Sequence, residues 1–350
     1  MGKKLLVFVL IAMVAVFLFA CQAAEEAAPE PEAEEEAPEP EEAEPEVEPI
    51  VLKYSDINAK ESYAGVFTEK FAELAEDKTE GRVIVETYYG GTLAGNDIEA
   101  TQTGIADFSQ HNVTEVIDLA PLVSILEVPF TFETAEDLYK VTASDSFIME
   151  KINSTLETQG VRILTTYSWG NQNILTTNAP VYSEADLDGL KIRVLPSNLY
   201  MDTMREMGAV PTPMAWGEVI TSLVTGVIDG TGMPMIYIVS TGLHEVQNYY
   251  IMTGHNPTLS GVFMNQASWE KLTPEDQQNL VAAGEEAREF ALQYKRDNLE
   301  EIRQTMLEEG MTIIEHDELD FDFERVRNTV FEIYEDEWGE NFEKILEMLE

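Results

Sequence analysis

One helical pattern, over residues 274–309, restricts the possible folds of this chain more than any other feature of its sequence. It opens with an N-cap, a first-turn proline and two acidic residues in Thr273-Pro274-Glu275-Asp276, and it ends before Gly310. Apolar residues recur along it at helical spacing: Leu280, Ala283, Ala287, Phe290, Tyr294, Ile302 and Met306. At 1.5 Å per residue this helix would be roughly 54 Å long, more than the width of one small lobe. We therefore expect that it either bridges two lobes or is broken near Asp297-Asn298.

Strand and helix patterns alternate through the body of the chain, from residue 50 to residue 350. Strand composition is found at residues 50–54, 82–88, 161–166 and 190–194. Helical spacing is found at Phe67, Phe71, Leu74 and Ala75, and over residues 199–207 and 216–225. This alternation predicts an α/β fold with largely parallel sheets. Because the body exceeds the size that one core usually serves, we expect two domains or one large two-lobed domain.

The first 21 residues have the pattern of an export signal. Lys3 and Lys4 precede an uncharged run of 15 residues, which is short for a membrane span and suits a signal-peptide core. The run ends in Leu18-Phe19-Ala20-Cys21, which resembles the lipobox of bacterial lipoproteins. This predicts a signal peptide over residues 1–20 and lipidation of Cys21, with an ordinary secretory signal as the alternative. Cys21 is the single cysteine of the chain, so no internal disulfide can form.

Residues 22–49 predict a disordered tether. Of these 28 residues, 13 are Glu, 7 are Ala and 6 are Pro. Such a segment has little to bury and repels itself, and its prolines interrupt every candidate helical turn. Fully extended, it would reach on the order of 90 Å. Residues 21–49 are therefore expected to join an acylated cysteine to the body by a mobile link.

Charge excludes one class of partner. The chain carries 66 Asp+Glu against 21 Lys+Arg, a formal net charge of −45. Without the tether and the two N-terminal lysines, the body still has 53 acidic and 19 basic residues, a net charge of −34. A surface of that sign repels phosphate backbones and anionic headgroups. We therefore expect no nucleic-acid partner.

Motifs for catalysis, cofactors and metals are missing from the sequence. The histidines His111, His244, His255 and His316 are scattered, so no metal site has local support, and each is expected to be a surface or hydrogen-bonded structural side chain. The glycine-rich stretches lack the spacing and the lysine of a phosphate-binding loop. No Gly-x-Ser-x-Gly motif is present. We expect no cofactor and no enzymatic activity.

Residues 170–255 carry a series of motifs that resembles a known family. These are DLDGLKIRV at residues 186–194, MGAVPTPMAWGEV at 207–219, GVIDG at 226–230 and EVQNY at 245–249. Their order and spacing resemble those of solute-binding proteins of tripartite ATP-independent periplasmic (TRAP) transporters, of the DctP type. Supporting matches are GRV at 81–83, GGTL at 90–93 and VPF at 128–130. The resemblance covers essentially residues 51–350.

The resemblance implies a two-lobed, periplasmic-binding-protein-like α/β fold that closes around a small ligand, with a long helix spanning both lobes. The first lobe would comprise about residues 50–169 and 259–298. The second would comprise about residues 170–258 and 299–350. The length expected for the 274–309 helix suits this arrangement.

The resemblance also names candidate ligand contacts, first among them Arg193. In the family this arginine pairs with the ligand carboxylate, and a planar guanidinium can donate two parallel hydrogen bonds to one carboxylate. The alternative is an arginine that pairs with a neighbouring Asp or Glu. Trp216 lies where the family has an aromatic wall of the cleft, and its alternative role is core packing.

Two departures from the family pattern concern the ligand. Asn171-Gln172-Asn173 aligns with a segment where many members carry a second arginine, and Gln172 takes that place. Residues 229–233 (DGTGM) replace a common Asp-Gly-Gln-Glu-Asn string, which puts Met233 where an asparagine often contacts the ligand. We include Gln172, Asn173 and Met233 among the candidate contacts. Their identity favours a smaller or more apolar monocarboxylate over a dicarboxylate or a sugar acid.

The first lobe offers a less defined set of candidates. Asn58, Gln110, His111 and Asn112 align loosely with loops that face the cleft in the family, and Asn112 is the preferred contact. Ordinary loop positions are the alternative.

The function implied is that of a lipid-anchored extracytoplasmic receptor. It would capture an organic acid by hinge closure and deliver it to integral membrane permease subunits. Two alternatives stay open: a tethered ligand-sensing module for a membrane receptor, and an extracellular hydrolase or lyase.

Overall fold

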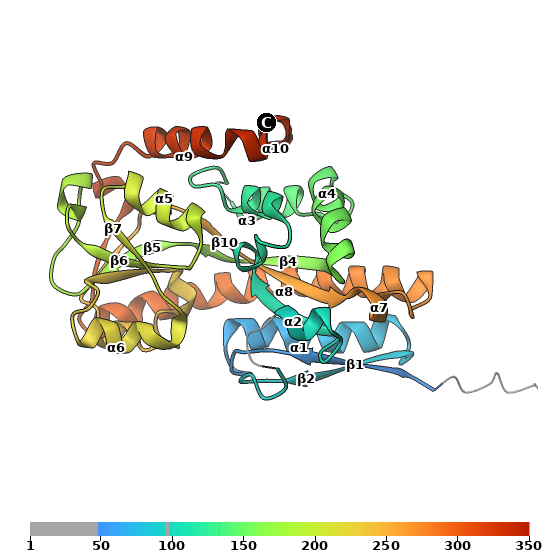
Figure 1. The fold of residues 1–350 in the computed structure, drawn as a ribbon. Coiled ribbons are helices and arrows are strands. Elements are labelled where there is room, and N and C mark those ends of the chain that lie inside the picture. Colours follow the sequence, from blue (N-terminus) through green and yellow to red (C-terminus); the bar gives the residue numbers. More distant parts are fainter. Residues whose placement is uncertain (1–47, 95–97, 133, 350) are drawn as a thin grey trace, which may run out of the picture. The chain divides into compact units, whose positions relative to one another are not determined.

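Two mixed β-sheets with helices around them form the described part of the chain (Figure 1). The computed structural model describes residues 48–94, 98–132 and 134–349. The predicted signal peptide, the lipidation at Cys21 and nearly all of the predicted tether lie outside the described residues. Within those ranges, no helix combines the length and the apolar character that crossing a membrane requires.

The first sheet has the strand order β2-β1-β3-β10-β4. Its strands are β1 (Ile50–Ser55), β2 (Val83–Tyr88), β3 (Phe108–Asn112), β4 (Val161–Asn171) and β10 (Pro257–Asn265). The second sheet has the order β11-β9-β5-β8-β6-β7. Its strands are β5 (Asn173–Thr176), β6 (Lys191–Val194), β7 (Val210–Pro213), β8 (Gly230–Met233), β9 (Tyr249–Ile251) and β11 (Thr312–Ile314).

Both sheets mix strand directions, so the expectation of largely parallel sheets holds only in part. β1 pairs in parallel with β2 and β3, and β6 with β7 and β8. However, β10 is antiparallel to β3 and β4, and β5 is antiparallel to β8 and β9. The chain passes from one sheet to the other between β4 and β5 and between β9 and β10, in each case by a short connection without a helix, so no crossover helix sets the direction in which β5 and β10 enter their sheets. Strand composition alone carries no information on that point.

The α-helices account for most of the remaining ordered chain. They are α1 (Tyr63–Lys78), α2 (Ile98–Gln102), α3 (Ala135–Val141), α4 (Phe147–Leu156), α5 (Asn198–Glu206), α6 (Val219–Val224), α7 (Gln266–Trp269), α8 (Pro274–Glu308), α9 (Phe323–Trp338) and α10 (Glu340–Leu349). Short 3₁₀ turns connect several of them, including η2 (Pro121–Glu127), η5 (Trp216–Glu218) and η6 (Met235–Tyr237). The expected helices over 199–207 and 216–225 correspond to α5 and to η5 with α6.

Helix α8 is the long helix that the sequence predicts, and it is unbroken. It runs for 35 residues and passes Asp297 and Asn298 without interruption, so the alternative of a break is wrong. It packs against helix α1 and against β4 of the first sheet (Figure 1), and it also meets the η6 turn and β11 of the second sheet. Its contact with β4 is close, because a Cβ on Gly284 would lie 2.7 Å from Thr165 Cγ2. The helix therefore contacts both sheets.

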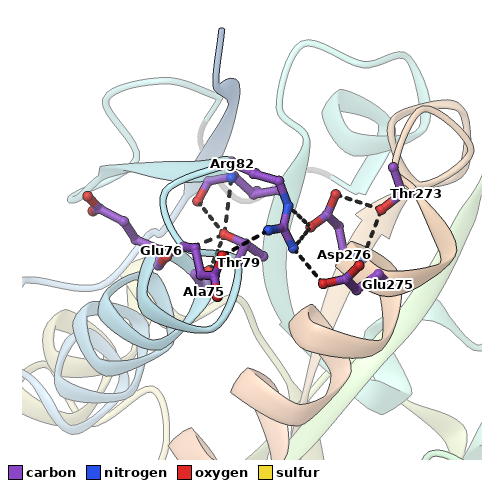
Figure 2. A network of polar contacts seen from close by, with 9 residues as sticks. Ala75, Glu76, Thr79, Arg82, Thr273, Glu275 and Asp276 are labelled. Carbon is purple, nitrogen blue, oxygen red and sulfur yellow. Dashed lines mark hydrogen bonds and ion pairs between the residues drawn. The ribbon is translucent and has the colours of Figure 1, made fainter. Parts of the chain in front are cut away.

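A polar network joins the end of α1 to the start of α8 (Figure 2). The Arg82 guanidinium contacts an Asp276 oxygen at 2.9 Å and a Glu275 oxygen at 3.1 Å. Thr273 caps α8 by accepting a hydrogen bond from Asp276 N at 3.1 Å. Thr79 Oγ1 in turn accepts from Val83 N at 3.1 Å and donates to the Ala75 carbonyl at 2.7 Å. The expected N-terminal cap of α8 is thus present and tied to the first sheet.

Two hydrophobic cores cover opposite faces of the strands, and each draws on both sheets. On β10, Val262 belongs to one core and Phe263 to the other; on β5, Leu175 and Ile174 divide in the same way. This follows from the two-residue period of a strand. The same alternation places Arg193 on the opposite face of β6 from Ile192, which is a core residue. The lobe boundaries proposed from the sequence remain a prediction.

Candidate functional site

A small cavity lies at the carboxyl end of β6, where Arg193 is found. Its lining residues are Gln172, Arg193, Val194, Leu195, Tyr200, Met204, Gly232 and His255. The free space between these side chains is about 10 Å³, roughly what one water molecule needs. The structure therefore brings together two of the candidates, Arg193 and Gln172, and adds Tyr200 and His255 to them.

Arg193 is buried without a carboxylate partner. Only 4% of the residue is exposed, and its Nε donates to the Met214 carbonyl at 3.0 Å. Within the described part of the chain, no ion pair and no further hydrogen bond engage its terminal nitrogens. Burial lowers the pKa of Arg193 to about 10, with the Glu115 carboxylate and Tyr200 acting in the opposite direction. The guanidinium thus stays charged at neutral pH, and the alternative of a neighbouring acidic partner does not apply among the described residues.

The local sheet geometry explains how Arg193 is held. β6 pairs in parallel with β7, which places Arg193 beside Thr212. The chain continues from β7 to Met214, whose carbonyl accepts from Arg193, and then into the η5 turn that begins at Trp216. As a result, the guanidinium carbon lies 5.8 Å from the centroid of the Trp216 ring. One short segment after β7 fixes both partners of Arg193.

Trp216 is a partly exposed side chain. It is 40% exposed and belongs to neither hydrophobic core. Its alternative role of core packing is therefore excluded. An indole next to a buried guanidinium presents an apolar surface and can stabilise the cation through its ring face.

Gln172 and His255 form an uncharged wall of the cavity. Gln172 Nε2 donates to Thr258 Oγ1 at 2.9 Å, which fixes the orientation of the amide. His255 Nδ1 lies 2.8 Å from Thr253 Oγ1. Burial lowers the pKa of His255 to about 3, so its imidazole is neutral at physiological pH. This is the hydrogen-bonded histidine that the sequence favoured, at a position where it also lines a cavity.

Tyr200 connects the cavity to a buried carboxyl group, Glu127. Tyr200 lies in the first turn of α5, and burial, followed by the charge of Glu127, raises its pKa. Glu127 Oε1 accepts from Asn112 Nδ2 at 3.0 Å and from Leu259 N at 2.8 Å, whereas Oε2 has no partner among the described residues. Burial raises the pKa of Glu127 to about 8. A protonated carboxyl group therefore lies behind the Tyr200 side of the cavity at pH 7.

Three other candidates lie outside the cavity lining. Asn112 caps the next turn through Thr114 N, at 2.9 Å, and otherwise contacts Glu127. Asn173 donates to Tyr250 Oη at 2.8 Å and accepts from Gly254 N at 2.9 Å. Met233 is 7% exposed and packs in a hydrophobic core. The amide groups of both asparagines are thus engaged within the protein.

The remaining first-lobe candidates are also bonded within the protein. Asn58 donates to Asp56 through its backbone N at 2.8 Å. Gln110 Oε1 accepts from the Tyr167 hydroxyl at 2.5 Å, and its Nε2 is buried without a partner among the described residues. His111 Nε2 lies 3.0 Å from Ser109 Oγ. None of these side chains lines the cavity at Arg193.

Sequence reasoning missed Tyr200 and His255 as cavity residues. A usable signal existed for Tyr200, because ligands in α/β folds bind near the carboxyl ends of strands and α5 is the first helix after β6. No local signal identifies His255, since only the pairing of β5, β8 and β9 brings its loop beside Gly232. In the described ranges, no group of three or more His, Cys, Asp or Glu side chains is arranged to hold a metal ion.

Comparison with known proteins identifies the family. The pattern of the family described as bacterial extracellular solute-binding protein, family 7 (DctP) matches residues 54–337. A solute-binding protein of Chromohalobacter salexigens is 34% identical over 256 residues, which are 73% of this chain and 76% of the relative. The C4-dicarboxylate-binding periplasmic protein DctP of Rhodobacter capsulatus is 31% identical over 268 residues, 76% of this chain and 80% of that protein.

Solved structures agree with the sequence comparison. A TRAP periplasmic solute-binding protein of C. salexigens, with bound D-glucuronate, aligns with a TM-score of 0.75 at 30% identity and covers 85% of this chain and 98% of its own. A second, from Roseobacter denitrificans with bound L-galactonate, aligns with a TM-score of 0.72 at 28% identity over 86% of this chain and 98% of its own. The two-lobed α/β fold expected from the sequence is therefore confirmed. This chain belongs to the DctP family of solute-binding proteins of TRAP transporters.

Proposed function

We propose that this protein is an extracytoplasmic receptor that binds a small organic acid through Arg193, closes around it at a hinge and delivers it to membrane permease subunits. The observation that carries the proposal is the state of Arg193. Its charge is buried, its Nε is fixed by the Met214 carbonyl, and its terminal nitrogens have no protein acceptor among the described residues. Burying such a charge is unfavourable unless an anion pairs with it, and a ligand carboxylate supplies that anion.

The relatives support a carboxylate ligand. The two solved structures described above hold D-glucuronate and L-galactonate, and the R. capsulatus relative is named for binding C4-dicarboxylates. These molecules differ in size and hydroxylation but share a carboxylate. That shared group is what a buried arginine is suited to bind, since two parallel hydrogen bonds match its geometry.

The other side chains have supporting roles in this proposal. Gln172 contacts the ligand directly, together with His255 and Tyr200, and Trp216 covers the guanidinium. Asn112 acts indirectly through Glu127 and Tyr200. Asn173 and Met233 hold β5 and β8 in place behind Gln172, because their Cα positions pair across these strands. The protein performs no chemistry in this proposal.

The location and the partners follow from the family and from the N-terminal sequence. Members such as the R. capsulatus relative are periplasmic. We further propose that Cys21 carries a lipid that anchors the protein to a membrane, and that residues 22–49 let the body reach the permease. Replacement of Cys21 by serine should release the protein from washed membranes, and retention of the variant in the membrane fraction would contradict the anchor.

A thermal-shift screen tests the role of Arg193. Organic acids are added to the wild type, to Arg193→Met and to Arg288→Met as a matched control. Arg288 is also buried and donates to the Thr142 carbonyl at 3.3 Å, but it does not line the cavity. Carboxylates should raise the Tm of the wild type and the control but not of Arg193→Met, because losing one partner of a buried ion pair costs about 2–5 kcal/mol of binding. Equal shifts in all three proteins would refute the assignment.

A further inference from the structure

A second cavity lies beside β4, the last strand of the first sheet, and it shares no lining residue with the cavity at Arg193. Its free space is about 190 Å³, compared with about 10 Å³ at Arg193. An apolar cavity of about 150 Å³ in a protein can hold a benzene molecule. The cavity beside β4 therefore has room for a small organic molecule.

Three segments of the chain form the walls of this cavity. Arg162 and Leu164 come from β4, Val281 comes from α8, and Ser144 and Asp145 come from the turn before α4. Leu164 is buried in a hydrophobic core, and Val281 packs against that core. β4 and α8 therefore supply an apolar wall, and the charged side chains of the lining are Arg162 and Asp145.

The uncharged polar side chains of the lining are already engaged within the protein. Asn153 Nδ2 donates to the Ile163 carbonyl at 3.0 Å, and its Oδ1 accepts from Ile163 N at 2.8 Å, so the amide covers the edge of β4 as a neighbouring strand would. Ser144 Oγ donates to Glu285 Oε1 at 2.9 Å, which ties the turn to α8. These bonds hold the walls in place and leave the two charged side chains to contact a ligand.

Arg162 is the only arginine of the chain whose guanidinium donates no hydrogen bond to a described residue. Its Nη2 lies 3.5 Å from Glu157 Oε1, beyond the length of about 2.7–2.9 Å of a charged hydrogen bond, and its Nε is buried without a partner in this part of the chain. The guanidinium carbon lies 4.0 Å from the centroid of the Trp269 ring, which stabilises the cation on one face. A carboxylate in the cavity would supply hydrogen bonds that this cation lacks.

Asp145 offers the opposite charge at the solvent side of the cavity. It is exposed, and its side chain has no hydrogen bond and no ion pair with any residue that the structure describes. It is not the cap of α4, because Ser146 Oγ accepts from Met149 N at 3.3 Å in that role. Its carboxylate is therefore available to a cationic group of a ligand.

From these observations we propose that the cavity beside β4 is a second ligand site, for a small zwitterion with an apolar side chain. The ligand carboxylate binds Arg162, the ammonium group binds Asp145, and the apolar part lies against Leu164 and Val281. A planar guanidinium is suited to the carboxylate, since it can donate two parallel hydrogen bonds. A zwitterion is favoured over a simple anion, because the body with its net charge of −34 repels anions but not a molecule without net charge.

Three probes with the same branched side chain test the chemistry of this site by calorimetric titration of the full-length protein. L-valine has both charged groups, 3-methylbutyrate lacks the ammonium group, and 2-methylpropylamine lacks the carboxylate. The titrations use the wild type and Arg193→Met, so that binding at Arg193 is recognised. In both proteins L-valine should bind equally well, and at least about tenfold more tightly than the other two probes bind to Arg193→Met, since each of these leaves one charged side chain without its partner.

Several outcomes of these titrations would overturn the proposal. If L-valine does not bind at millimolar concentrations, the site does not exist. If L-valine binds the wild type but not a folded Arg193→Met, it binds at the other cavity. If 3-methylbutyrate binds Arg193→Met as tightly as L-valine does, the site takes anions and not zwitterions.

Variants of the lining locate the site. Arg162→Met and Asp145→Asn should each weaken L-valine binding by about tenfold or more. The matched control is Arg205→Met, because Arg205 pairs with Asp202 on α5 and lines neither cavity; its affinity for L-valine should equal that of the wild type. Asp145 is exposed, so Asp145→Asn keeps the test decisive even if Arg162→Met does not fold. An unchanged affinity in Asp145→Asn, or in a folded Arg162→Met, would refute the proposed site.

Discussion

Arg82 and Arg193 show two opposite uses of the same side chain. Arg82 joins α1 to α8 near the surface, with 32% of its side chain exposed, and it contacts the carboxylates of Glu275 and Asp276 (Figure 2) and that of Glu80. Arg193 is buried and has only the Met214 carbonyl as a hydrogen-bond partner among the described residues. In a body with a net charge of −34, an arginine without a carboxylate is the more informative of the two.

The difference lies in what the surrounding chain leaves unsatisfied. Around Arg82 the guanidinium is saturated by acidic side chains, so it contributes to structure and offers nothing to a ligand. Around Arg193, a residue of the cavity lining, the fold supplies one carbonyl and leaves the terminal nitrogens without an acceptor among the described residues. Keeping a buried charge in this state lowers stability, and such sites are typical of binding functions.

The largest effect on stability is expected at Glu127, a buried carboxyl group that we compare with the arginine-paired carboxylates of Glu275 and Asp276. Unlike Glu275 and Asp276, it has no cationic partner in the described part of the chain, and burial raises its pKa from 4.5 to about 8. Between pH 4.5 and pH 8, Glu127 is therefore protonated in the folded state and ionised in the unfolded state. The contribution of Glu127 to stability falls as the pH rises through this range. The variant Glu127→Gln keeps the shape of the side chain but cannot ionise, so it does not lose stability in this way as the pH rises. Its free energy of unfolding relative to the wild type should rise by about 2–4 kcal/mol between pH 5 and pH 8.

Denaturant unfolding of both proteins at the two pH values measures this difference. Subtracting the value of the wild type removes the contributions of other ionisable groups. One of these is His255, whose lowered pKa has the opposite effect on the pH dependence of stability. His255 favours the folded state above pH 6.5, and that contribution is lost as pH falls towards 3. A constant difference between the two proteins would mean that Glu127 is ionised in the folded state.

The second effect concerns Arg193 in the protein without ligand. Arg193→Met removes an uncompensated buried charge and keeps apolar volume, so we expect the free energy of unfolding to increase by about 1 kcal/mol. The lost hydrogen bond to Met214 limits the gain. Urea unfolding of ligand-free protein measures the change. A decrease would indicate that Arg193 is a structural residue, like Arg82.

The smallest effect is expected at Arg82. Arg82→Met should lower the free energy of unfolding, but by less than either of the preceding variants changes it, because ion pairs of an arginine with 32% of its side chain exposed contribute little. This loss should shrink in high salt, where screening weakens the pairs with Glu275 and Asp276 in any case. Ligand-induced Tm shifts should match those of the wild type. A salt-independent loss, or a weaker ligand response, would remove the contrast between the two arginines.

Much of the fold was predictable from local patterns. The cap at Thr273 and the apolar spacing up to Met306 identified α8 to within a residue at its C-terminal end. The strand at residues 190–194 and the motif around Arg193 identified the main candidate of the site. Strand direction was not predictable, because β5 and β10 change sheets through short connections. The partners of Asn112 and Asn173 were not predictable either, because Glu127 and Tyr250 are distant in sequence.

The sequence by itself determined the elements, the long helix and the family, since these depend on the spacing and order of nearby residues. It also determined the net charge of −34 of the body, against which Arg193 is the most informative positive charge. Only the tertiary structure decided that Arg193 has no carboxylate partner among the described residues, that Gln172 fills the space at Gly232, and that Tyr200 and His255 share the cavity. Those facts depend on contacts between segments that are distant in sequence. Burial at these contacts determines the charge states of the side chains and which polar atoms are left without a partner.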